Sequence, residues 1–238
     1  MQSHPAARRP LATAGMAALA SFWLTASAMA GSVWLPGMEG VSNVAVRSIQ
    51  ERKFDRVVRQ QYDFSCGSAA LATLLTYHYE DATDEPKAFR AMFDKGDQEK
   101  IAQVGFSLLD MKNYLEANGY QADGYQASLE TLVDAKVPAI ALINYRGYRH
   151  FVVVKGVTAE DVIIGDPSLG LRSIPRAEFK GMWENGILFI IRNKAAVGQR
   201  NFNADADWGR ILKAPLGLAV DRESLGTLTV LSQGFGLL

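Results

Sequence analysis

Residues 60–75, with the sequence QQYDFSCGSAALATLL, decide the fold because they join the chain's only cysteine to the start of an apolar helix. A polar segment leads into Cys66 and Gly67, and good helix formers follow at once. The alanines and leucines give this helix a broad apolar face, as a helix at the centre of a small domain needs. We therefore expect a buried helix over residues 66–79 that begins at the cysteine.

The position of Cys66 favours a reactive thiol. Unpaired backbone N–H groups and the helix dipole at a helix N-terminus stabilise a thiolate, so the sequence predicts a lowered thiol pKa. The alternative is an inert buried thiol, since free cysteine is among the most buried residue types. We interpret Cys66 as a nucleophile and search the rest of the chain for its partners.

Length and charge restrict the class of protein. The 238 residues fit one domain with extensions. Lys and Arg number 25 and Asp and Glu number 25, so the basic surface of a nucleic-acid-binding protein is not expected.

The first thirty residues have the pattern of a cleavable signal peptide. Arg8 and Arg9 precede an apolar run over 16–26, and the small-x-small site at 28–30 leaves Gly31 as the first mature residue. The alternative is a membrane anchor, but the run is shorter than the roughly 20 residues of a bilayer span. No later stretch is long and apolar enough to span a bilayer, so we expect an exported protein without a stable membrane span.

Periodicity divides the rest of the chain into a helical half and a strand-rich half. Helices are expected over 66–79, 86–94, 107–119, 128–135 and 177–183, and strands over 44–49, 139–144, 150–157, 161–165, 171–174 and 187–192. Helices followed by closely spaced strands predict an α+β fold with an antiparallel sheet. Residues 194–238 form an extension of unknown role, with a hairpin expected over 217–231.

A cysteine nucleophile needs a base, and His150 is the best candidate. His4 would leave with the signal peptide, and His78 lies 12 residues beyond Cys66 on the expected helix. At the rise of an α-helix that separation is about 18 Å, too far for contact with the thiol. His150 opens an apolar strand directly after a polar turn, a place that suits a base at the rim of a cleft.

Asp166 is the best candidate to orient the base. It ends the strand that follows the one begun by His150, and antiparallel pairing would bring the two side chains together. Asp161 is the other candidate, although it lies in the turn at the far end of that hairpin. The aromatic side chains of Tyr145, Tyr148 and Trp183 fit either a substrate groove or the core.

These motifs together resemble the bacteriocin-processing peptidases of family C39. The stretch RQQYDFSCG at 59–67, HFVV at 150–153 and GDP at 165–167 carry the likeness over residues 50–192. The resemblance implies a papain-like cysteine peptidase over 51–193, with the helical half that carries the nucleophile helix packed on the sheet and a lead-in at 31–50. Both Gln60 and Gln61 precede the cysteine, and the family places its oxyanion glutamine six residues before it, which selects Gln60.

The resemblance also implies a function. Transporter members of the family cut leader peptides after a double glycine, whereas a chain with a signal peptide is similar to stand-alone periplasmic members, one group of which is encoded with functional-amyloid export systems. We therefore expect a periplasmic peptidase with a Cys-His-Asp triad that needs no metal or organic cofactor. Its partners would be a peptide or protein substrate and components of a fibre or peptide export system, with no nucleic acid. The alternatives are a non-catalytic peptide-binding module and a papain-like amidase or transferase.

Overall fold

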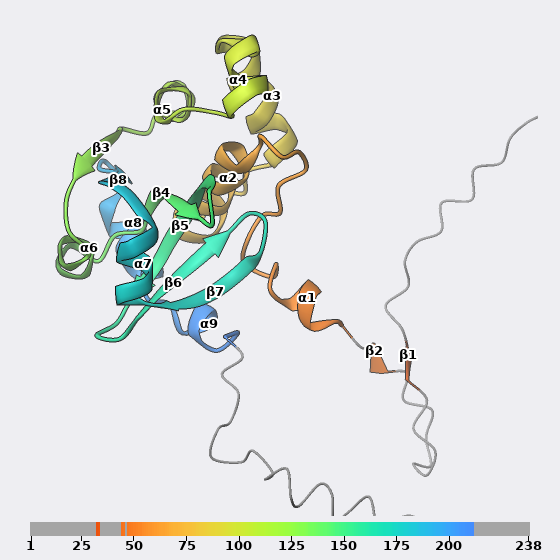
Figure 1. Cartoon of the computed structure of the whole chain (residues 1–238), viewed down its shortest axis with the longest axis vertical. Helices are drawn as coiled ribbons and strands as arrows, with labels where there is room; N and C mark the ends of the chain where they lie inside the picture. The colour runs from red at the N-terminus through yellow and green to blue at the C-terminus, as the bar shows by residue number, and fades with distance from the viewer. Residues whose placement is uncertain (1–31, 34–43, 46, 212–238) are drawn as a thin grey trace, which may run out of the picture. The chain divides into compact units, whose positions relative to one another are not determined.

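The computed structural model describes residues 32–33, 44–45 and 47–211, and the chain divides into two units at residue 46 (Figure 1). In the first unit, β1 (Ser32–Val33) pairs antiparallel with β2 (Val44–Ala45). The expected signal segment 1–30 and the expected hairpin over 217–231 lie outside the described residues.

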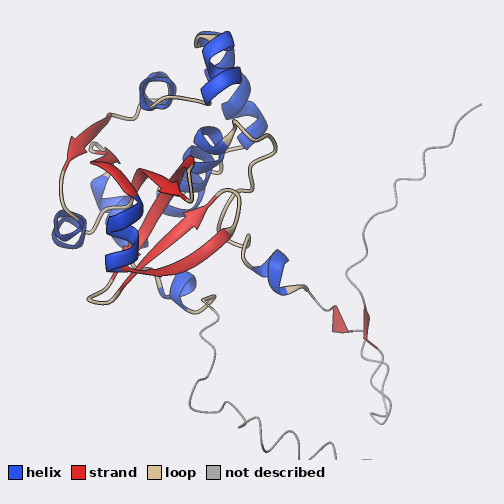
Figure 2. Ribbon diagram, viewed as in Figure 1, coloured by secondary structure: helices blue, strands red, loops and turns tan. Residues whose placement is uncertain are grey.

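The second unit is an α+β domain in which helices lie on a sheet (Figure 2). Its helices are α1 (Ile49–Arg52), α2 (Cys66–His78), α3 (Glu85–Lys95), α4 (Gln98–Val104), α5 (Leu108–Ala117), α6 (Leu129–Ala135), α7 (Arg176–Met182), α8 (Ala195–Asn201) and α9 (Asp205–Trp208). Its strands are β3 (Ala122–Gln126), β4 (Ala139–Tyr145), β5 (Tyr148–Val157), β6 (Asp161–Asp166), β7 (Gly170–Pro175) and β8 (Trp183–Ile191). The predicted fold class is confirmed.

The six strands form one antiparallel sheet with the order β3-β8-β4-β5-β6-β7. Strands β4 to β7 form a meander, as their short sequence spacing predicts. Strand β8 does not continue that meander, because α7 carries the chain back across the sheet and β8 pairs between β3 and β4. The pairing of β5 with β6 shifts register between Val154 and Gly156, so Lys155 lies in a bulge.

Two apolar cores lie on the two faces of the sheet. On one face, α2, α3 and α5 pack against Phe151, Val153 and Phe189. On the other face, α6 and α7 cover Val152, Val154 and their neighbours on adjacent strands. Helix α2 is buried along most of its length, so the nucleophile helix sits between the sheet and the remaining helices, as its apolar sequence predicts.

Local capping signals fix several helix ends. Ser107 and Asp110 form a capping box at the start of α5, and Ser128 accepts a hydrogen bond from the backbone N–H of Thr131 at the start of α6. Gly119 follows α5 with a φ of +78°, a conformation that favours glycine. These helix ends confirm the sequence predictions at Ser107, Gly119 and Ser128.

Several short elements differ from the sequence prediction, among them α8 and α9, which the sequence analysis does not predict. The expected strand over 44–49 is observed at residues 44–45 but is wrong from Ser48 onward, because Ser48 and Glu51 form a capping box that starts α1. Helix α4 was not predicted, since its seven residues show too little apolar periodicity. Edge strand β3 is largely exposed and also lacks a pattern, so its pairing with β8 decides its conformation.

The described part of the extension is folded against the domain. Phe202 joins the core beneath α6 and α7, and the side-chain amide of Asn203 pairs with the backbone of β5 at Val157, with distances of 2.7 and 3.1 Å. Among the described helices, none has the length and apolar character needed to cross a membrane.

Candidate active site

Cys66 is the first residue of α2, and a tight turn presents it there. The Ser65 hydroxyl accepts hydrogen bonds from the backbone N–H groups of Gln61 and Tyr62, at 3.2 and 3.1 Å, and donates to the Tyr62 carbonyl. The Cys66 side chain is 7% exposed and contacts the backbone N–H of Phe151, the residue after His150. The helix N-terminus and β5 therefore bring Cys66 beside the predicted base.

His150 and Asp166 form a buried pair, with 3.1 Å between Nε2 of the histidine and Oδ2 of the aspartate. Their side chains are 2% and 0% exposed. Because an ionised carboxylate only accepts, Nε2 carries the proton that the pair shares, and Nδ1 is left as the acceptor. Within the described part of the chain Nδ1 has no hydrogen-bond partner, so it is the ring nitrogen that is available as a base.

Asp166 accepts hydrogen bonds on both oxygens. Its Oδ1 accepts from the backbone N–H groups of Ser168 and Leu169, at 2.8 and 3.1 Å. Burial alone would raise the pKa of this carboxyl, but the hydrogen bond and charge of His150, with the two N–H groups, hold the pKa below its usual value. The carboxylate is thus ionised and fixed. Asp161, the other candidate, begins β6 at the opposite end of the strand.

Gln60 lies against the turn that follows Asp166. Its backbone N–H donates to the carbonyl of Pro167 at 3.1 Å, and its side-chain Oε1 accepts from the Ser168 hydroxyl at 2.9 Å. Its Nε2 donates to the carbonyl of Tyr62 at 3.1 Å. Gln61 is exposed, whereas Gln60 is half-buried, so the structure brings Gln60 rather than Gln61 toward the Asp166 turn.

The predicted lowering of the Cys66 pKa is wrong in direction. Burial raises the pKa of the thiol, while hydrogen bonds from the N–H groups of Phe151 and Gly67 act against that rise. The negative charge of Asp166 raises the pKa further. The sequence indicates the helix N-terminus but not how deeply the thiol is buried, and burial has the larger effect on its pKa.

Tyr148 joins the two halves of the site. Its ring stacks on the His150 ring with centroids 5.0 Å apart, and its hydroxyl donates to the carbonyl of Asp63 at 3.0 Å. Two hollows meet at Tyr148 and Asp63: one of about 600 Å³ reaches Cys66, and one of about 450 Å³ reaches Gln60. Tyr148 therefore lines the cleft, which resolves one of the aromatic alternatives.

Trp183 lies in the core and not in the cleft, since it packs against Phe179 on the face of the sheet that α6 and α7 cover. Sequence reasoning missed Ser168, whose role depends on a contact with Gln60 across 108 residues. It also missed the carbonyl of Asp63, which no side-chain pattern could reveal. In the described ranges, no three side chains of His, Cys, Asp or Glu are grouped so that they could hold a metal ion.

Comparisons with known proteins identify the family. A family model described as the peptidase C39 family matches residues 55–195. Two bacterial proteins named "Probable functional amyloid protease FapD" are similar: that of Pseudomonas fluorescens is 41% identical over 170 residues, which cover 71% of this chain and 75% of the relative. That of Pseudomonas aeruginosa is 43% identical over 167 residues, which cover 70% and 73%.

Among solved structures, the peptidase domain of Streptococcus ComA, a bi-functional ABC transporter involved in a quorum sensing pathway, matches with a TM-score of 0.48 and 21% identity. The match covers 57% of this chain and 96% of that domain. A double glycine motif protease from an AMS/PCAT transporter, solved in complex with the leader peptide, matches with a TM-score of 0.46 and 28% identity, over 57% and 89% of the two chains.

Because burial raises the pKa of Cys66, alkylation of the substrate-free enzyme by iodoacetamide should be slow at neutral pH. The rate should keep rising through neutral pH, and the midpoint of its pH profile should lie above the value of about 8.5 for a free cysteine. The chain has one cysteine, so the pH profile reports this site alone. The same protein in denaturant is the control and should return to the free-thiol midpoint. A plateau below about pH 7 would show instead a thiolate–imidazolium pair in the resting enzyme.

Proposed function

The chain belongs to the peptidase C39 family and is a cysteine peptidase, and we propose that Cys66, His150 and Asp166 form its catalytic triad. The observation that carries this proposal is the buried His150–Asp166 pair of 3.1 Å beside a cysteine at a helix N-terminus. Asp166 fixes the imidazole so that Nδ1 is unprotonated, which is the form that can take a proton from the thiol.

The raised pKa of Cys66 indicates how the first step proceeds. The thiol is neutral until Nδ1 of His150 takes its proton, as sulfur attacks the scissile carbonyl and the carbonyl oxygen becomes an oxyanion. The imidazolium, stabilised by the Asp166 carboxylate, then gives the proton to the leaving amine as the C–N bond breaks. Water attacks the resulting thioester with His150 as base, which releases the acid and restores the thiol.

The oxyanion is proposed to accept hydrogen bonds from the backbone N–H of Cys66 and from Nε2 of Gln60. Support comes from the position of Gln60, whose Oε1 accepts a hydrogen bond from Ser168, which fixes the orientation of the amide and of its donor Nε2. In the substrate-free site Nε2 donates to the Tyr62 carbonyl at 3.1 Å. An oxyanion would replace that neutral acceptor with a charged one, and charge-assisted bonds are about twice as strong.

We infer that the substrate is an exported peptide or protein connected with functional amyloid. Support comes from the names of the two Pseudomonas relatives and from the signal-like pattern of residues 1–30. The first thirty residues would direct the enzyme to the periplasm, and components of a fibre export system would be its partners. The hollow of about 600 Å³ lined by Cys66 and Tyr148 offers a place for such a chain.

The triad is tested with a peptide that the wild-type enzyme selects from a library, with cleavage followed by mass spectrometry. Cys66→Ala and His150→Ala should abolish cleavage, and Asp166→Asn should lower kcat by roughly a hundredfold to ten-thousandfold. The loss from Asp166→Asn is large because both carboxylate oxygens face N–H donors, so an amide NH₂ would oppose one of them.

Asp161→Asn, at the other end of the same strand, is the matched control and should keep activity near the wild-type level. Circular dichroism should show that all four variants are folded. Peptide binding by the wild-type enzyme without any cleavage would indicate a binding module. Turnover of small amides in place of peptides would indicate an amidase or transferase.

Gln60→Ala should lower kcat by about a hundredfold to a thousandfold, the usual cost of one oxyanion donor, with little change in KM. Gln61→Ala is the matched control, since its side chain is exposed and should change kcat little. Steady-state kinetics of both variants on one peptide give the answer. Loss confined to the Gln61 variant would place the oxyanion donor one residue later.

Export is tested by sequencing the N-terminus of the protein recovered from the periplasm of its bacterial host. Cleavage after the small-x-small site should leave Gly31 as the first residue. An Ala28→Leu, Ala30→Leu double variant, which removes both small residues, should remain uncleaved and membrane-bound. An intact Met1 in the soluble wild-type protein would contradict export.

A further inference from the structure

The segment that carries Gln60, residues 54–60, has no regular secondary structure of its own. It crosses from α1 to α2 and is held by contacts with other elements. The backbone N–H of Val58 donates to the Thr73 hydroxyl on α2 at 2.9 Å, and that of Gln60 donates to the carbonyl of Pro167 at 3.1 Å. The position of the Gln60 amide therefore depends on the contacts that hold this segment.

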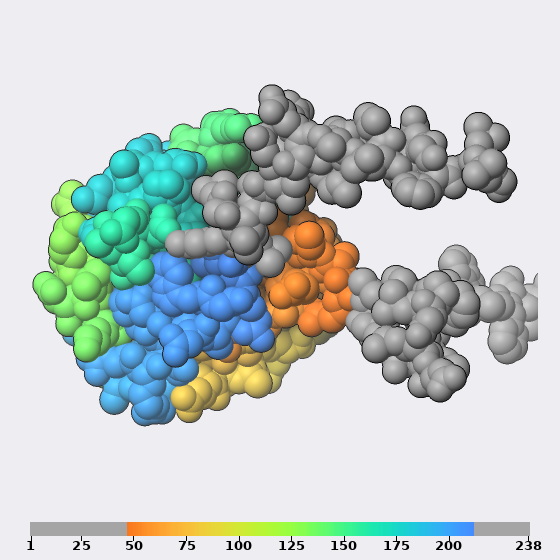
Figure 3. Space-filling model, turned by 90° about the horizontal axis from the view of Figure 1, so that it is seen from below, coloured from red at the N-terminus to blue at the C-terminus, as the bar shows by residue number. Residues whose placement is uncertain are grey.

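Helix α9 of the C-terminal extension contacts this segment through the buried carboxylate of Asp207. The carboxylate Oδ1 of Asp207 accepts a hydrogen bond from Nε of Arg56 at 2.7 Å, across 151 residues of sequence. Asp207 is 1% exposed, and Arg56 is 20% exposed. Figure 3 shows the extension, in blue, beside the orange surface of residues 47 onward, so the contact joins segments far apart in the chain.

Lys155 is the third member of this cluster and is fully buried. Its Nζ donates to the carbonyl of Arg56 at 3.1 Å and lies 3.4 Å from Oδ1 of Asp207. Burial lowers the pKa of this lysine to about 8, and the charge of Asp207 opposes that fall. Lys155 occupies the bulge of β5, so the strand that presents His150 and the segment that presents Gln60 meet at one carboxylate.

The other groups around the two cations supply no second anion. The ring of Tyr77 lies 5.3 Å from the Arg56 guanidinium and 5.2 Å from Nζ of Lys155. His78 is buried, and its burial and both cations hold its pKa well below the usual value, so it stays neutral. Among the described residues, Asp207 is the one carboxylate that pairs with either cation.

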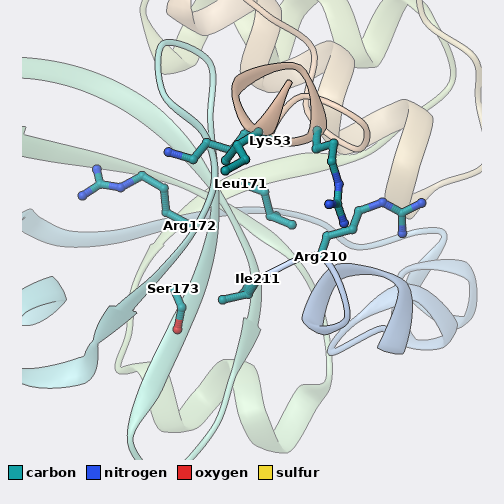
Figure 4. Close-up of a pocket in the computed structure, with 8 residues that line it drawn as sticks. Lys53, Leu171, Arg172, Ser173, Arg210 and Ile211 are labelled. Carbon is teal, nitrogen blue, oxygen red and sulfur yellow. The ribbon is translucent and has the colours of Figure 1, made fainter. Parts of the chain in front are cut away.

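Apolar contacts seat α9 on the same segment. Trp208 and Ile211 pack with Val57, and Leu171 of β7 lies in the same cluster. Figure 4 looks into the adjoining hollow, where Ile211 and Leu171 approach the chain at Lys53, whose carbonyl accepts a 2.8 Å hydrogen bond from the Leu171 N–H. The segment therefore lies between α2 and α9. Backbone hydrogen bonds join its two ends, at Lys53 and Gln60, to β7 and to the turn before it.

We propose that Asp207 is a positioning residue of the peptidase, which acts through Arg56 and Lys155 to hold the Gln60 amide at the oxyanion site. The family match ends at residue 195, so this function belongs to the extension and not to the matched domain. The proposal rests on the proposed role of Gln60. It gives residues 205–208 a part in catalysis, although none of them lines the hollows at Cys66 and Gln60.

The test is a kinetic cycle on the full-length enzyme. Asp207→Asn should lower kcat about ten- to hundredfold, because small misplacements of a catalytic group have losses of this size, while KM stays within about twofold. In a Gln60→Ala background the same change should cause no further loss. The alkylation rate of Cys66, which does not use Gln60, should be unchanged within about twofold. Asp205→Asn, exposed on the same helix, is the matched control and should keep full kcat.

A second variant keeps the test decisive if Asp207→Asn does not fold. Arg56→Met removes the side-chain bond from the segment to Asp207 but leaves the Asp207–Lys155 pair and the Lys155 bond to the backbone carbonyl of residue 56, and it should show the same kinetic pattern. Independent, additive losses in the Gln60→Ala background, or an equal fall in the alkylation rate, would overturn the positioning role. A Gln60→Ala variant with normal kcat would instead overturn the oxyanion role itself, and with it the ground for this inference.

Discussion

The buried hydrogen bond between His150 and Asp166 is the interaction on which the rest of the site depends. It exists because β5 and β6 pair antiparallel, so that the start of one strand reaches the end of the next. A carboxylate with no exposed surface is costly unless all its acceptor capacity is used. The His150 ring and two backbone N–H groups supply that compensation, and they fix the imidazole tautomer as they do so.

Burial both orders this site and raises the pKa of its thiol. The thiol of Cys66 is placed by the first turn of α2, but the same packing removes the water that would stabilise a thiolate. The helix N-terminus and the Phe151 N–H offset only part of that loss. In the proposed mechanism the nucleophile therefore ionises during attack, as His150 takes the thiol proton.

Features that depend on neighbours in sequence could be predicted, and features that depend on burial or distant contacts could not. The helix that begins at Cys66 could be predicted from its apolar sequence, and the proximity of His150 and Asp166 from strands in consecutive order. The direction of the Cys66 pKa required knowledge of burial, and Ser168 required the contact with Gln60. Strand β3 and helix α4 carry too little periodicity to be seen without their partners. The sequence around Asp207 does not distinguish it from an exposed acidic residue, because its burial depends on the distant contact with Arg56.

The turn after β6 couples the base to the proposed oxyanion donor. Asp166 orients His150 from this turn, Pro167 accepts from the Gln60 backbone, and Ser168 holds the Gln60 side chain. Gly170 closes the turn with a φ of +81°, where a side chain would meet the Lys53 backbone at 2.8 Å. Three successive residues therefore set the relative positions of the proposed base and the proposed oxyanion donor, which come from opposite halves of the fold. A displacement of this turn would move the base and the donor together, so the sheet and the segment at 54–60 have to fit as one body. The buried carboxylate of Asp207, which ties that segment to the bulge of β5 from outside the turn, meets the same constraint.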